Sequence, residues 1–176
     1  MLFATKKKES RKSFLYRFLF SNTPLYRATG ARVTFCSADF QEIHVKLTKN
    51  LLTRNYVNTI FGGSIYSSID PIFMLMLMEI LGKNYVVWDK AATIRFVRPA
   101  RQKLKARFLL DDTLIENIKK QIAETKETDL ELTLEYLDEE EKICATFSKV
   151  LYIADKNFYA EKRKQKGQTA EYKTVI

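Results

Sequence analysis

The chain has 176 residues, of which 46% are hydrophobic and 29% charged, as expected of one globular domain and not of a disordered chain. Its two cysteines, Cys36 and Cys144, both lie in apolar runs, which excludes a disulfide-stapled scaffold and favours a reducing, cytoplasmic setting. No apolar run reaches the roughly 18 uninterrupted residues that span a bilayer, so a soluble protein is expected.

The net charge of +9 comes from the two ends of the chain. Residues 1–32 hold eight basic residues and one acid, and residues 155–176 hold six basic residues and three acids. Residues 33–154 are close to neutral, so no nucleic-acid partner is expected. The basic N-terminus keeps open a further class of function, a protein that contacts a membrane surface or nucleic acid through this segment.

The first part of the chain predicts a helix followed by a hairpin. Residues 13–27 carry a helical stripe that includes Phe14 and Leu19, and Arg17 interrupts the apolar patch with no cleavage site after it, which argues against a signal peptide. Residues 31–48 then alternate as two strands that turn near Ala38.

The second part predicts a buried helix, four strands and a further helix. Residues 61–81 are apolar almost all round, and Gly82 stands in the usual position of a C-terminal glycine. Alternating segments and one amphipathic helix follow, at 84–97, 103–110, 113–126 (the helix), 130–137 and 142–153.

Six mostly alternating strands and one long apolar helix predict an α+β fold, an antiparallel six-stranded sheet wrapped around the helix. This domain is expected over 30–154. A basic helical extension at 1–29 precedes it, and a basic, flexible tail at 155–176 follows it.

The apolar helix contains two adjacent glycines, Gly62 and Gly63, and a carboxylate, Asp70. A helix start offers unpaired amides to an oxyanion, and glycine lets a substrate approach the backbone closely. Gly63 and Asp70 lie on one stripe but about 10 Å apart at roughly 1.5 Å per residue, too far to act on one carbonyl. Two antiparallel copies of the helix in a dimer would bring them together. The alternative is structural, with Asp70 as the N-cap of a helix that begins at Pro71.

These residues resemble a known family. Asn55, the Gly62-Gly63 pair and Asp70, followed by Arg98-Pro99-Ala100 at a strand end, look like the hotdog-fold acyl-CoA thioesterase superfamily, in a poorly characterised bacterial thioesterase-like branch. The resemblance covers roughly residues 30–153, in strand order as well as in motif.

The resemblance implies hydrolysis of an acyl-CoA or acyl-carrier-protein thioester by a homodimer or a dimer of dimers. The Gly63 amide would polarise the carbonyl, Asp70 would activate water or attack directly, and Asn55 would hold the nucleophile or substrate. No cofactor is expected beyond the coenzyme A part of the substrate. Many relatives have a histidine just before the glycines, whereas this chain has Ile60 and Phe61, which keeps a non-catalytic acyl-CoA- or lipid-binding protein as the alternative.

Further residues are expected to bind substrate, without a metal. The basic segment 95–107 suits the phosphates of coenzyme A, and relatives often place a hydroxyl residue near the position of Asp89. His44, the only histidine, is expected at the surface, and no Cys or His residues stand at metal-ligand spacing. The expected substrate-binding residues are Phe61, Gly62, Ser67, Asp89, Arg95, Arg98 and Arg101.

Overall fold

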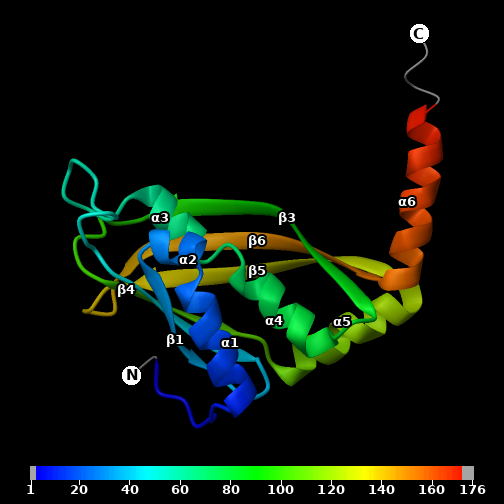
Figure 1. Ribbon diagram of the computed structural model, residues 1–176, viewed down its shortest axis with the longest axis horizontal. Coiled ribbons are helices and arrows are strands. Elements are labelled where there is room, and N and C mark those ends of the chain that lie inside the picture. The colour runs from blue at the N-terminus through cyan, green and yellow to red at the C-terminus, as the bar shows by residue number, and fades with distance from the viewer. Residues whose placement is uncertain (1–2, 172–176) are drawn as a thin grey trace.

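The protein, seen in a computed structural model, is described over residues 3–171, with side chains described through residue 165. Figure 1 shows a long twisted sheet with the central helix α4 in its concave side. The elements, in chain order, are α1 (Arg11–Asn22), α2 (Pro24–Ala28), β1 (Ala31–Cys36), β2 (Glu42–Leu47), α3 (Gly62–Ser67), α4 (Ile72–Leu81), β3 (Tyr85–Phe96), β4 (Leu104–Leu109), α5 (Asp112–Thr125), β5 (Glu127–Leu137), β6 (Ile143–Asp155) and α6 (Lys156–Glu171).

All six strands form one antiparallel sheet in the order β1-β2-β4-β5-β6-β3. The prediction of an α+β fold with a six-stranded antiparallel sheet around a central helix is therefore confirmed. The two edges differ, because β1 is short and lies under α1, while β3 runs for 12 residues with most of its side chains exposed.

The central helix is broken near Asp70, at the place where the structural alternative begins a new helix. α3 ends at Ser67 and α4 begins at Ile72, with Pro71 at the N-cap and no side-chain capping bond. A helix thus begins at this point, as the structural alternative proposes, although Asp70 is not its N-cap. Gly82, at φ 82°, ends α4 as predicted.

Two tyrosines hold this break in place. The Tyr26 hydroxyl donates to the Ser68 carbonyl at 2.8 Å, and the Tyr136 hydroxyl lies 2.8 Å from Ser68 Oγ. Below the break, α4 buries its apolar side against the sheet, where the rings of Phe73 and Phe108 meet at 4.9 Å. The break is thus a fixed part of the core.

Two expectations about the ends of the chain are also corrected. The N-terminal helix splits at Thr23, since Pro24 has no N–H and starts α2. Residues 156–171 form α6 and not a loose tail, because Asp155 caps the helix through the amides of Asn157 and Phe158. The last five residues lie outside the described part.

His44 is buried, not at the surface. It is 7% exposed and its Nε2 lies 2.7 Å from Glu42 Oε1. The N-terminal segment covers this face of β2, with Thr5 bonded to Glu42 and Phe3 against the imidazole. The alternation of polar and apolar residues along β2 does not show that a segment distant in the sequence buries the polar face of this strand.

Cys36 and Cys144 are both buried and free. Within residues 3–171, one helical stretch, Gly62–Leu81, is long and apolar enough to cross a membrane. Half of it is buried by the protein itself, as befits the core helix of this fold.

Candidate active site

Asp70 lies at the break between α3 and α4, with 43% of its side chain exposed. Lys149 Nζ, from β6, lies 3.0 Å from Asp70 Oδ1 and 2.8 Å from Asp89 Oδ2, and it also donates to the Asp70 backbone carbonyl. The Lys149 side chain is only 6% exposed. A buried ammonium thus ties the exposed Asp70 carboxylate to β3, where Asp89 lies.

Lys149 is a site residue that sequence reasoning missed. It occupies an inward position of β6, in the series Ala145, Phe147, Lys149, Leu151 and Ile153, all of which are buried. A buried charge is stable only with partners, and the two carboxylates provide them. A lysine on the apolar side of an alternating strand was the signal that could have found it.

The two carboxylates differ in their surroundings. Burial raises the pKa of Asp89 above its ordinary value, and the nearby charge of Asp70 adds to this, while Lys149 opposes it. Burial also raises the pKa of the Tyr66 hydroxyl, and Asp70 contributes to the same shift. Asp70 is the more exposed carboxylate of the pair, so it is the one that can reach a substrate or a water molecule.

Asp70 and Gly63 line the same depression, of about 620 Å³, which we call the Asp70 hollow. It lies between α2 and α3, and Ser67 also lines it. Its other walls include the apolar side chains of Phe61, Leu52 and Leu25. Four of the residues predicted for the site, Phe61, Gly63, Ser67 and Asp70, therefore meet at one hollow.

The glycine pair is packed between two aromatic rings. A Cβ on Gly63 would lie 2.3 Å from Cε1 of Phe61, and one on Gly62 would lie 2.9 Å from Cζ of Phe96. Neither glycine has a positive φ, so the need for glycine here is steric. The first-turn amides of a helix such as α3 have no acceptor within the helix, which leaves the Gly63 N–H available to a ligand.

Gly62 and Asn55 line a second depression of about 550 Å³, the Arg98 hollow, together with Arg98 and Arg101. The Asn55 side chain closes its own loop, since Oδ1 accepts from the Thr59 amide at 2.9 Å and Nδ2 donates to Thr59 Oγ1 at 2.9 Å. The structure thus places Asn55 away from Asp70, on the other side of the glycine pair.

The expected phosphate-binding arginines do not all come together. Arg98 and Arg101 share the Arg98 hollow, while Arg95 lines a different depression beside Arg107. Among residues 3–165, no cluster of three His, Cys, Asp or Glu side chains is placed to hold a metal ion.

With this geometry described, the fold can be compared with solved structures. A Pseudomonas aeruginosa protein of unknown function described as a probable thioesterase, PA5026, superposes with a TM-score of 0.73 at 16% identity, over 85% of this chain and 99% of that one. Thioesterase HI1161 of Haemophilus influenzae gives 0.60 at 16% identity, over 86% and 96%. The PaaI protein of the E. coli phenylacetic acid degradation operon gives 0.57 at 17% identity, over 82% and 94%.

At these identities the likeness shows the fold alone, which is the hotdog fold. Residues 11–153 match DUF4442, described as a domain of unknown function, and the chain belongs to this family. No curated protein matches the sequence significantly.

Proposed function

We propose that the protein hydrolyses the thioester of an acyl-CoA or of an acyl-carrier protein. The observation that carries the proposal is the state of Asp70, an exposed carboxylate held by a buried lysine at a hollow that Gly63 also lines. A positioned carboxylate can act as a general base or nucleophile, and a helix-start amide can stabilise an oxyanion, so the two groups suit thioester hydrolysis.

In the proposed reaction, the Gly63 N–H donates to the thioester carbonyl oxygen and stabilises the negative charge that develops there. Asp70 takes a proton from a water molecule as the water oxygen attacks the carbonyl carbon, the C–S bond breaks, and Asp70 passes this proton to the departing thiolate. On the alternative route Asp70 attacks the carbon itself and displaces the thiolate, and a water molecule then hydrolyses the mixed anhydride, which frees Asp70 and supplies the proton of the thiol. Lys149 keeps the carboxylate in position throughout.

The catalytic groups are proposed to come from two copies of the chain. Gly63 lies in the first turn of α3 and Asp70 lies beyond its C-terminal end, whereas both groups must lie about 3 Å from one carbonyl. β3 is a 12-residue edge strand on which Trp88 and Phe96 are 54% and 55% exposed. Proteins usually cover such an edge. Pairing of β3 with β3 of a second copy would cover it and bring Asp70 of the partner subunit towards Gly63.

A non-catalytic acyl-CoA-binding protein is the second candidate. It is favoured by Ile60 and Phe61, which stand where many relatives have a histidine. In either case, Arg98 and Arg101 in the Arg98 hollow are suited to the phosphates of coenzyme A, because arginine binds phosphate through paired N–H donors.

The experiment is a panel of acyl-CoA thioesters given to the wild-type protein and to Asp70→Asn, with thiol release and acyl-CoA binding both measured. We expect the wild type to release thiol and Asp70→Asn to lose about 100-fold or more in rate, in the range of a removed general base. Binding should stay within a few-fold. Tight binding without hydrolysis by either protein would support the second candidate, and equal hydrolysis by both would exclude Asp70.

A further inference from the structure

Helix α1 displays its large apolar side chains outward. Phe14, Leu15, Phe18 and Leu19 are 50%, 53%, 54% and 58% exposed, and their i, i+1, i+4, i+5 spacing places them on one face. A surface helix normally buries such a stripe. In this helix the stripe is the exposed side.

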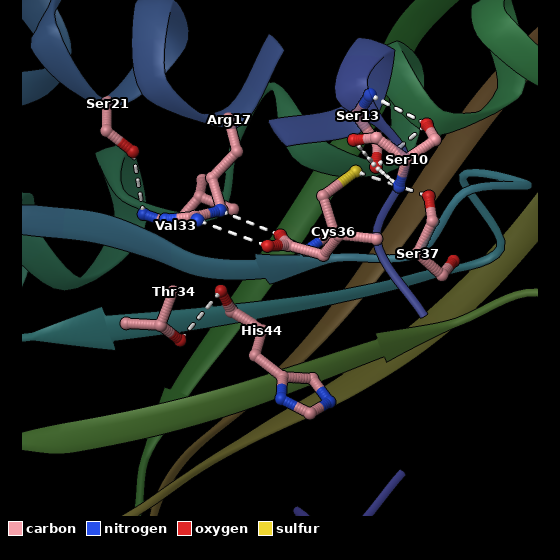
Figure 2. Close-up of polar contacts among 10 residues, drawn as sticks. Ser10, Ser13, Arg17, Ser21, Val33, Thr34, Cys36, Ser37 and His44 are labelled. Atoms are coloured by element: carbon pink, nitrogen blue, oxygen red, sulfur yellow. Dashed lines mark hydrogen bonds and ion pairs between the residues drawn. The ribbon is translucent and has the colours of Figure 1, made fainter. Parts of the chain in front are cut away.

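The inward face of α1 is held by Tyr16 and Phe20, which pack against the core, and by polar contacts (Figure 2). Ser10 and Ser13 form a capping box, and the Ser21 hydroxyl accepts the Val33 amide of β1 at 3.0 Å. Arg17 binds Glu9, whose carboxylate accepts the Cys36 amide at 3.0 Å. These side chains fix α1 along the edge of β1, so the outward orientation of the apolar stripe is built into the fold.

The charges around α1 indicate which kind of partner would bind its exposed apolar face. No acidic residue occurs between Glu9 and Asp39, while Arg11, Arg27 and Arg32 are exposed in that interval and Lys6 and Lys8 are exposed just before it. The acids that approach this segment, Asp39 and Glu79, are paired with Lys7 and Lys12. The surface is therefore apolar and cationic.

We infer that α1 docks on an anionic phospholipid surface, with Phe14, Leu15, Phe18 and Leu19 in the acyl boundary and the flanking lysines and arginines at the headgroups. Basic amphipathic helices bind membranes in this way. A second copy of the chain fits less well, since a symmetric contact through α1 would place two cationic segments against each other. The inference holds whether or not the Asp70 hollow hydrolyses a thioester.

The same orientation places the hollow near the membrane. Leu25 of α2 and Leu52 are 84% and 85% exposed, and both line the Asp70 hollow. Leu25 follows the end of α1 by three residues. Docking through α1 thus brings the mouth of this hollow close to the layer that contains acyl chains.

The experiment uses vesicles of phosphatidylcholine alone and of equal parts phosphatidylcholine and phosphatidylglycerol, with co-sedimentation as the readout. We expect binding to the anionic vesicles, weakened by salt and much lower on the neutral ones. The double variant Leu15→Gln/Leu19→Gln should bind at least about tenfold less, because two leucine side chains no longer enter the acyl boundary. Leu109→Gln, at a position 50% exposed on β4, is the matched control and should bind as the wild type does.

A charge pair and a fluorescence probe complete the test. Lys8→Glu/Arg11→Glu should lose binding, and Lys119→Glu/Lys120→Glu on α5 should keep it. Phe18→Trp, made in a Trp88→Phe background, should be quenched by brominated phospholipid, and the native Trp88 on β3 should not. The inference is overturned if anionic vesicles are not bound or if Leu15→Gln/Leu19→Gln binds them normally. It is also overturned if that variant only dissociates an oligomer, which would assign α1 to a contact between copies.

Discussion

Lys149 and Asp70, 79 residues apart in the chain, form an ion pair of 3.0 Å across the break in the central helix. The same ammonium reaches Asp89 at 2.8 Å. One buried charge therefore connects β6, β3 and the α3–α4 junction. This link holds the proposed catalytic carboxylate in a fixed place relative to the sheet.

Replacement of this lysine should affect both stability and rate. Lys149→Met leaves two carboxylates without their cation, and we expect a loss of about 1–3 kcal/mol in the free energy of unfolding, less than for a fully buried pair because both acids are partly exposed. Urea unfolding measures this loss.

The rate readout separates positioning from mere folding. Lys149→Met should reduce kcat more than it changes KM, because the carboxylate is no longer held in position. Lys149→Arg, which keeps the charge, should retain more of the wild-type kcat. An unchanged kcat in a folded Lys149→Met protein would contradict a positioning role.

A methyl group at the glycine pair should act through Phe61. The Cβ of Gly63→Ala would lie 2.3 Å from Cε1 of the Phe61 ring, which is 57% exposed and can move. We expect the variant to fold and to hydrolyse at least about tenfold more slowly, as for a disturbed oxyanion donor. The second change Phe61→Ala, in the same chain, should recover part of the rate by making room. No recovery would mean that the added methyl blocks the substrate directly.

The free edge of β3 predicts an oligomer. Trp88→Lys/Phe96→Lys places two charges on the exposed edge, and we expect the wild type to sediment as a dimer or larger and the variant as a monomer. Hydrolysis should fall with dissociation, because the site is shared. Leu109→Lys, on β4, is the control with a similar exposure. A monomeric wild-type protein that hydrolyses thioesters would contradict the shared site.

The buried Glu42 predicts a pH dependence of stability. Burial works to raise the pKa of Glu42, but hydrogen bonds from Arg107, His44 and Thr5 overcome this and hold the pKa below its ordinary value. The stabilisation is therefore present above the unfolded pKa of about 4.3 and is lost as the pH falls through the lower folded pKa, at about 1.4 kcal/mol per unit of difference. Denaturant unfolding of the wild type and of Glu42→Gln should converge as the pH falls below that range. Parallel curves would assign the stability of this region to other groups.

The sequence predicts the sheet well because most strands alternate and each turn has its own signal. The Asp70-Pro71 pair indicates a helix start as one of two alternatives, but the sequence does not show that Ser68, at this break, binds the hydroxyls of Tyr26 and Tyr136, which lie 42 and 68 residues away. The sequence also does not show that Lys149 forms an ion pair with Asp70. Lys149 is recognisable as unusual only once its strand face is known to be buried.

The structure brings only some of the predicted site residues together. Phe61, Gly63, Ser67 and Asp70 meet at one hollow, whereas Asn55 belongs to the neighbouring one and Arg95 to a third. Spacing along a helix fixes which residues share a stripe. The placement of Asn55 and Arg95 depends on how a loop and a strand end fold back onto that helix. The spacing of residues along the sequence does not predict this folding.

Complementation between two inactive variants tests whether Gly63 of one chain and Asp70 of the other form the proposed thioesterase site. Asp70→Asn and Gly63→Val are each expected to be inactive alone, the second because the larger side chain collides with Phe61. Co-expressed and purified as a mixed dimer, they form one site with both defects and one site with none. Our account predicts that acyl-CoA hydrolysis returns to about half of the wild-type rate per dimer, as expected when one of two independent sites is intact. A mixed dimer no more active than its two parents would contradict the shared site.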